Sequence, residues 1–180
     1  MWLICKGGLN TKAKLKGWSL LLDYTCVLCN SHSESVGHLF FSCDFSNHVW
    51  KYLLNAVSIF RSVGNIEQEL AWLSCVFKDK CFKASIIKIL FSVAAYHIWM
   101  ERNNHIYSGK CNPKEKIIQL ILADLGDATI SWRNVTRSFE NWELCLSLGV
   151  TNRIFFQSCF ALLCFLMALL PILSKCVLRL

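Results

Sequence analysis

The spacing of apolar positions predicts a chain made mostly of helices. From residue 44 to 57, apolar side chains recur every three or four positions, as on the buried face of an amphipathic helix. The same period predicts helices over 67–77 and 83–103, and residues 12–22 would tolerate a further one. There is no long run with the alternation of a strand and no internal repeat. The predicted fold class is therefore mainly α.

Another helix is predicted to begin just after residue 112. Asn112 can cap it, Pro113 suits the first helical position, and Glu115 would complete a capping box. Isoleucine and leucine then recur at helical intervals as far as Leu125. From 126 to 150 the pattern is weaker, and the sequence assigns no element there.

Residues 26–37 differ from the rest, because they are rich in Asn and Ser and show no apolar period. Cys26, Cys29, His38 and Cys43 have the spacing Cys-x2-Cys-x8-His-x4-Cys. A short turn between two cysteines presents both sulfurs to one ion, and the histidine and last cysteine complete a tetrahedron. Four protein ligands leave no position for a substrate water. The spacing therefore predicts a structural zinc ion that orders a loop without a core of its own.

Two other histidines are rivals for the fourth position. His32 follows Cys29 too closely for easy tetrahedral closure, and His48 would face the surface of the following helix. In a competing interpretation, Cys26 and Cys29 are unrelated thiols and His38 caps a helix. A measurement of bound metal separates these interpretations.

Composition divides the chain into an ordinary part and an apolar tail. Hydrophobic residues make up 54% and charged residues 17%, whereas about 25% charged is usual. The excess lies in residues 154–173, IFFQSCFALLCFLMALLPIL, which contain no charge. About 20 such residues cross a bilayer as a helix, so this segment is a candidate C-terminal transmembrane helix. We predict three regions: a zinc-binding domain over 1–60, a helical region over 61–150 and the apolar tail over 151–180.

Cysteine content and charge bear on the compartment and the partner. Eleven irregularly spaced cysteines favour a reducing compartment. The predicted localisation is nuclear or cytoplasmic if the tail does not insert, and a membrane if it does. A net charge of +7, with lysines just before the cysteines, is compatible with RNA or DNA as partner. The plainer alternatives are that the lysines lie on a solvated loop or helix face and that the aromatic residue belongs to the core. The candidate contacts are Lys12, Lys14, Lys16, Lys51 and Trp18.

The sequence contains no pattern typical of an enzyme site. Gly7 and Gly8 stand alone rather than in a phosphate-binding loop, and no histidine has a nucleophile at a recognisable spacing. Nothing in the sequence around Cys75, Cys81 or Cys111 indicates an activated thiol. We expect neither catalysis nor a small-molecule substrate.

The run CVLCNSHSESVGHLFFSCDFSNHVWKYLL, residues 26–54, resembles the zinc-binding domain that follows the reverse transcriptase in plant non-LTR (LINE-type) retroelements. The shared features are the CxxC pair, Glu34 before His-Leu-Phe-Phe, the next cysteine, and Val-Trp on a helix. The segment IWMERNN, residues 98–104, resembles a Trp-x-Glu-Arg-Asn segment that often follows. By position alone, Glu101 and Arg102 are interpreted as a charge pair at a helix end.

This resemblance covers about residues 8–110 and implies a retroelement-derived, non-catalytic zinc module that assists RNA or DNA binding. The Asp-Asp pair of the polymerase is missing, and the chain ends in an apolar tail where relatives can continue toward an RNase H-like region. We therefore predict a fragment of a decayed element. The alternatives are a membrane-anchored fragment and a zinc-stabilised protein-interaction domain that uses the exposed side of helix 44–57 or 83–103.

Overall fold

Most of the first 150 residues are described by the structure, and they form helices. The computed structural model describes residues 4, 6, 8–17, 23–130, 132 and 135–150. In chain order the elements are α2 (Lys12–Gly17), the π-helix η1 (His38–Ser42), α3 (Asp44–Ala56), α4 (Ile66–Lys78), α5 (Phe82–Tyr107), α6 (Lys114–Thr129) and α7 (Phe139–Ser147). The described residues form no strand, and their one β pairing is an isolated bridge between Thr25 and Ser33. The mainly α fold class is confirmed.

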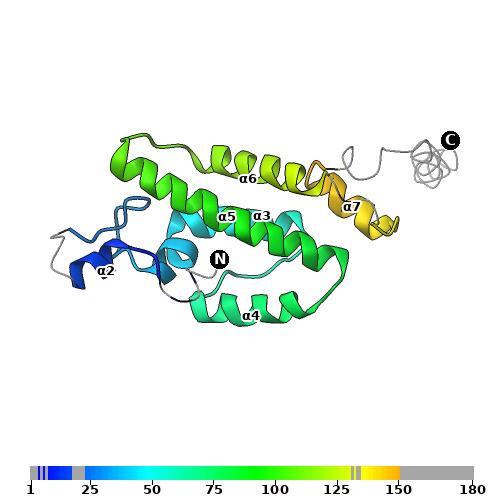
Figure 1. Ribbon diagram of the computed structural model, residues 1–180, viewed down its shortest axis with the longest axis horizontal. Coiled ribbons are helices and arrows are strands. Elements are labelled where there is room, and N and C mark those ends of the chain that lie inside the picture. Colours follow the sequence, from blue (N-terminus) through cyan, green and yellow to red (C-terminus); the bar gives the residue numbers. More distant parts are fainter. Residues whose placement is uncertain are drawn as a thin grey trace, which may run out of the picture.

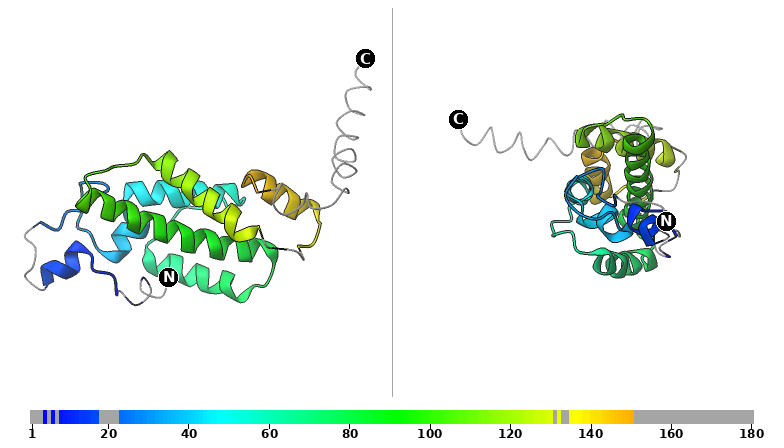
Figure 2. Two further views of the ribbon diagram at one scale, coloured as in Figure 1. Left: turned by 45° about the horizontal axis from the view of Figure 1, so that its top comes forward. Right: turned by 90° about the vertical axis from the view of Figure 1, so that its left-hand side faces the viewer.

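Helix α5 is the central element of the bundle. It crosses the middle of Figure 1 between α4 and α6, and α3 lies beside it as well. Its buried side chains include Ile86, Leu90 and Ile98. From α6, Ile121 and Leu125 join the same core with no exposed surface. The core therefore lies between α3, α5 and α6, with α4 and η1 closing it from the other side (Figure 2).

The bounds of the predicted helices agree with α3 and α4 to within about a residue. Helix α5 continues to Tyr107, beyond the predicted end at residue 103. The apolar period stops at Ile98, but the helix continues because Glu101 and Arg102 are buried and paired rather than exposed. Periodicity underestimated this helix because its last turns bury polar side chains.

The predicted capping box at the start of α6 is wrong. Pro113 occupies the N-cap position, and no side chain caps the helix. Instead, the Asn112 backbone N–H and side-chain Nδ2 donate to the two carboxylate oxygens of Glu101, at 2.6 and 2.8 Å. Hydrogen bonds to a buried carboxylate are stronger than those to a neutral helix end, so Glu101 recruits this asparagine.

Helix α7 was not predicted from the sequence. Ser138 caps it by accepting a hydrogen bond from the Asn141 backbone N–H at 3.2 Å. Only Leu144 and Cys145 are buried within the helix, while Phe139 is 67% exposed. A nine-residue helix that buries two side chains has too short an apolar stripe to be recognised by its period.

The candidate transmembrane segment 154–173 lies outside the described residues. Among the helices that are described, α5 alone is long and apolar enough to cross a membrane, with a mean hydropathy of 1.2 over its best window. Of that window, 44% is buried within the protein. In this structure α5 is therefore a core helix of the bundle.

Candidate metal centre

The structure brings the four predicted zinc ligands together. The candidate ligand atoms of Cys26, Cys29, His38 and Cys43 all lie within 4.8 Å of one another. The sulfurs of Cys26 and Cys43 are 3.9 Å apart, and the Cys29 sulfur is 3.3 Å from Nε2 of His38. Zinc–sulfur bonds of about 2.3 Å in a tetrahedron would place two sulfurs about 3.8 Å apart. The donor set and its spacing therefore fit a zinc ion.

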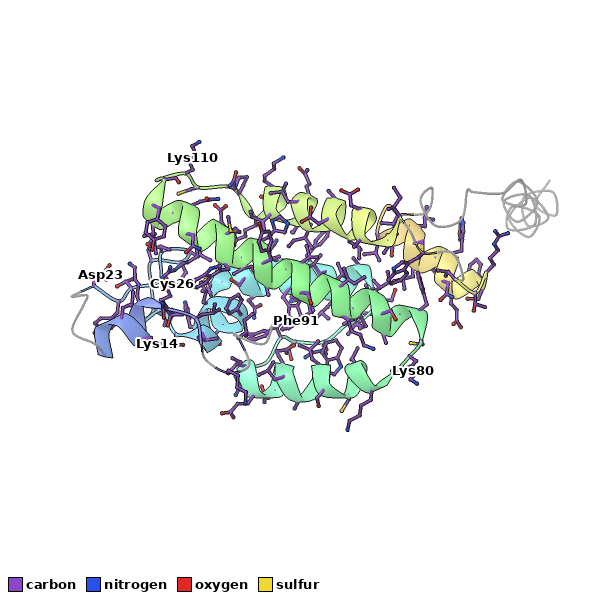
Figure 3. The ribbon with its side chains drawn as sticks, viewed as in Figure 1. Lys14, Asp23, Cys26, Lys80, Phe91 and Lys110 are labelled. Carbon is purple, nitrogen blue, oxygen red and sulfur yellow. The ribbon has the colours of Figure 1, made fainter. Side chains whose placement is uncertain are left out.

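A tight turn positions the first two cysteines. The backbone N–H of Asn30 donates to the Cys26 carbonyl at 2.8 Å, and the N–H of Cys26 donates to the His32 carbonyl, also at 2.8 Å. Asn30 has a φ of 53°, a left-handed conformation that asparagine tolerates better than most residues. We call residues 26–43 the metal loop, and Cys26 marks its place near one end of the molecule in Figure 3.

A wide helical turn positions the other pair. The N–H of Cys43 donates to the His38 carbonyl at 2.7 Å, five residues back, and this bond closes η1. Cys43 is also the N-cap residue of α3. π-type turns are often found at functional sites, and here the turn brings an imidazole and a thiol to the same side. Leu39, Phe40 and Phe41, which lie between the two ligands in this turn, are buried in the core.

The electrostatics of the cluster suit a cation. The hydrogen bond between the Cys26 and Cys43 thiols, together with burial, raises the pKa of Cys26 above its ordinary range. The same hydrogen bond lowers the pKa of Cys43. Burial, and after it the neighbouring His32, lowers the pKa of His38, which favours the neutral imidazole that binds metals. A zinc ion would supply the positive charge that the clustered sulfurs need in order to ionise together.

Neither rival histidine belongs to the cluster. His32 and His48 are exposed, although the His32 ring lies 5.5 Å from that of His38. Of the three histidines considered, His38 is therefore the one that the fold places beside the three cysteines. That these four side chains hold the ion stays a prediction, and the metal analysis proposed below tests it.

Glu34 links the metal loop to two other parts of the chain and has no exposed surface. Its Oε1 accepts from Nη2 and Nε of Arg102 at 2.7 and 3.1 Å, and from the Lys12 backbone N–H at 2.9 Å. The N–H of Ala13 donates to the Glu34 carbonyl at 3.1 Å. Glu34 thus binds both the start of α2 and the last turns of α5. In the sequence, Glu34 stands out only as part of the resemblance carried by residues 26–54.

The interpretation of Glu101 and Arg102 as a charge pair at a helix end is wrong. They are 1% and 3% exposed, and each pairs with a different segment. Arg102 binds Glu34, which is 68 positions away in the chain, while Glu101 accepts from Asn112. Glu34 and Arg102 each belong to one of the two segments that resemble the family. That shared membership was the only signal in the sequence for their pairing, and spacing alone could not reveal it.

The described part of the chain shows three of the five candidate nucleic-acid contacts. The ammonium group of Lys12 lies 3.1 Å from Asp23, and the Lys12 side chain is 14% exposed. Lys14 is half-buried and interacts with neighbouring groups, and Lys51 is exposed on α3. The side chains of the other two candidates, Lys16 and Trp18, lie outside the described residues.

Residues 1–50 match the family model described as zinc-binding in reverse transcriptase. The match includes the four cluster residues, so the resemblance based on residues 26–54 is confirmed, and the cofactor suited to this site is zinc. This family is a zinc-binding domain and not a catalytic polymerase domain. Its origin in a plant LINE-type element stays a prediction. No curated protein and no solved structure matches the chain.

Proposed function

From this match to the zinc-binding family of reverse transcriptases, we propose that the chain is a non-catalytic, zinc-ordered module that binds RNA or DNA. Its source would be a retroelement. The observation that supports the binding role best is the attachment of a basic helix to the metal loop through Glu34.

The attachment makes the position of α2 depend on the metal. The first turn of α2 donates two backbone N–H groups to Glu34, one to its carboxylate and one to its carbonyl. This helix has the sequence KAKLKG and no acid in its first turn. A zinc ion that orders the metal loop would therefore also hold a row of lysines against it. Lysines placed in this way can neutralise phosphates of a nucleic acid backbone.

A closed metal shell is consistent with a structural rather than a catalytic role. Two of the sulfurs, those of Cys26 and Cys43, are fully buried, and four protein donors fill a tetrahedron. A catalytic zinc keeps one position for water, which this donor set would not leave. The module would then hold nucleic acid without acting on it.

The direct test compares two triple variants of the full chain by fluorescence anisotropy with single-stranded RNA and DNA. In the first, Lys12, Lys14 and Lys16 become alanine. In the control, the same charge is removed at the α4–α5 turn, at Lys78, Lys80 and Lys83. Lys14 and Lys80 lie at opposite ends of the molecule (Figure 3).

We expect the first variant to bind more weakly and the control to keep most of its affinity. Because each phosphate contact contributes about 0.7 to the salt dependence for single strands, three lost contacts should lower the slope of log K against log salt by about 2. Removal of zinc with a chelator should have an effect at least as large. Unchanged affinity and slope in the first variant would sink the binding proposal.

A zinc-stabilised protein-interaction domain remains the alternative, and one observation favours it. Tyr96 and Met100 are 57% and 39% exposed, one turn apart on α5, and form an apolar strip on its outer side. Tyr96→Ser with Met100→Ser should abolish nuclease-resistant capture of a protein partner if this strip is the contact. Capture that disappears on nuclease treatment would favour nucleic acid instead.

The membrane prediction is a separate question about residues 154–173. Alkaline carbonate extraction of cells expressing the full chain would decide it, because a spanning helix stays in the membrane pellet. Release into the supernatant would exclude a transmembrane tail and leave the module nuclear or cytoplasmic.

A further inference from the structure

We propose that Cys111 is a reactive thiol, paired with His105, that forms mixed disulfides with low-molecular-weight disulfides. It lies just beyond the end of α5, at the same end of the molecule as the metal loop, where Lys110 and Cys26 are both labelled in Figure 3. The proposal concerns a modification site and is independent of nucleic-acid binding.

The site is a cluster of four side chains. The Cys111 sulfur is exposed and lies 3.5 Å from Nδ1 of His105. The other ring nitrogen, Nε2, lies 3.1 Å from Oε1 of Glu101. Glu101 is 1% exposed and accepts hydrogen bonds from Asn112 on both of its oxygens. The imidazole therefore lies between the thiol, near one ring nitrogen, and a buried carboxylate, near the other.

The acceptors around the imidazole determine where its protons lie. Nδ1 of His105 is also 3.1 Å from the Val27 carbonyl oxygen, which can only accept. The Glu101 carboxylate accepts two N–H groups from Asn112 and faces Nε2 of the ring with the same Oε1 atom. Each ring nitrogen therefore lies beside an acceptor, and the Cys111 sulfur lies on the Nδ1 side. This geometry places the sulfur to pass its proton to the imidazole and act as the nucleophile.

Glu101 is the positioning residue of this group. Its carboxylate holds the imidazole from the side opposite the sulfur, and Asn112 holds the carboxylate. Sequence spacing did not indicate this arrangement, because His105 lies inside α5 while Cys111 lies in the connection after it. The end of the helix brings the thiol back toward a ring six positions earlier.

The reaction is an exchange that balances without any further reagent. The thiolate of Cys111 attacks one sulfur of the small disulfide, a new S–S bond forms and the original S–S bond breaks. The second sulfur leaves as a thiolate with the bonding electron pair. Cys111 is oxidised and the small disulfide is reduced, while the proton of the thiol stays on His105.

Two other cysteines give internal comparisons. Cys75 is exposed on α4, and its sulfur makes no hydrogen bond within the described residues. Cys145 is buried, and burial raises its pKa to about 12, so it should not react. The cysteines of the metal loop are protected when zinc is bound. Cys75 is therefore the control: an exposed thiol that has no histidine beside it.

The test measures mixed-disulfide formation by peptide mass analysis on the zinc-loaded full chain. Oxidised glutathione and the uncharged hydroxyethyl disulfide are the probes, so that attraction of an anionic disulfide by Lys110 is separated from thiol reactivity. We expect Cys111 to react about tenfold faster than Cys75 with both probes. His105→Gln should lower the Cys111 rate to that of Cys75 and leave the Cys75 rate unchanged.

Equal rates in the parent protein, or a Cys111 rate that stays high in His105→Gln, would overturn the proposal. If His105→Gln loses zinc or helix content, the ultraviolet thiolate absorbance of the parent minus that of Cys111→Ser decides the question. This substitution is at an exposed position and leaves His105 in place. A thiolate signal at neutral pH supports the pair, and its absence overturns it.

Discussion

The first half of the metal loop and the helix α5 are held in opposite ways. Between residues 26 and 37, the buried side chains are Cys26 and Glu34, and neither is a hydrocarbon. Helix α5 instead buries a stripe of apolar groups that includes Leu90 and Phe91. Most of the helix is held by the hydrophobic effect, while the first half of the loop has almost no apolar area to bury and needs an ion and hydrogen bonds.

This difference indicates that the two regions can lose their structure separately, yet they are joined by buried polar contacts. Arg102 of α5 binds Glu34 of the loop, and His105 of α5 contacts the Val27 carbonyl. The Glu34–Arg102 pair adds little net stability over an apolar pair of the same volume, because both charges lose their hydration. The predictions below test whether the regions separate, beginning with the largest expected effect.

Removal of the metal should break the loop and leave the bundle. We expect one bound zinc ion per chain in the parent and none in a Cys26→Ser, Cys43→Ser double variant. The lost apparent binding energy is on the order of 10 kcal/mol for structural zinc. Elemental analysis and amide hydrogen exchange measure the two effects, with Cys75→Ser as the control. Well-folded parent protein without zinc would contradict the central assignment.

Loss of the link between the regions should have the next largest effect. Arg102→Met leaves the Glu34 carboxylate buried without its partner, and removal of one member of a buried pair typically costs about 3 to 5 kcal/mol. Denaturant unfolding measures this, with the exposed Lys110→Met as control. A double variant with Glu34→Gln should recover part of the loss. A parent-like midpoint for Arg102→Met would show that the two regions are not coupled.

A cavity in the bundle should leave the metal in place. Leu125 has no exposed surface, so Leu125→Ala should lower the free energy of unfolding by about 2 to 5 kcal/mol. Zinc content should stay at one ion per chain, because Leu125 lies in α6 and not in the loop. Leu146→Ala, at a position 54% exposed, is the matched control. Zinc loss in Leu125→Ala would mean that the loop depends on the core.

The smallest expected effect concerns Glu69, whose burial would raise its pKa. Hydrogen bonds from Arg61, Gly64 and Trp50 outweigh burial and lower the pKa below the ordinary 4.5. The stability from this carboxylate is therefore present above about pH 4.5 and is lost as the pH falls through the folded-state pKa. Glu69→Gln should cost about 1 to 3 kcal/mol at neutral pH.

Thermal unfolding across a pH series checks this prediction for Glu69. The Glu69→Gln variant should lose less stability on acidification than the parent, because it has no carboxylate to protonate at this position. Glu67→Gln on the same helix is the control, since Glu67 is exposed. Equal acid sensitivity in the parent and in Glu69→Gln would place the titrating group elsewhere.

Local patterns carried the predictions that the structure bears out. The helical period predicted α3 and α4. The Cys-x2-Cys-x8-His-x4-Cys pattern predicted the three cysteines and the histidine that the fold brings together. Two of the errors have a common cause. The false capping box at Asn112 and the early end assigned to α5 both come from Glu101, a buried carboxylate that binds a distant segment.

The sequence by itself determined the fold class, the likeness of residues 1–50 to a zinc-binding family and the group of side chains suited to zinc, because each depends on contacts within a few turns of chain. Only the tertiary structure decided which buried charges pair, as Glu34 does with Arg102, and that Cys111 lies beside His105. Pairing across 68 positions follows from how helices pack, and side-chain spacing contains no information about that distance.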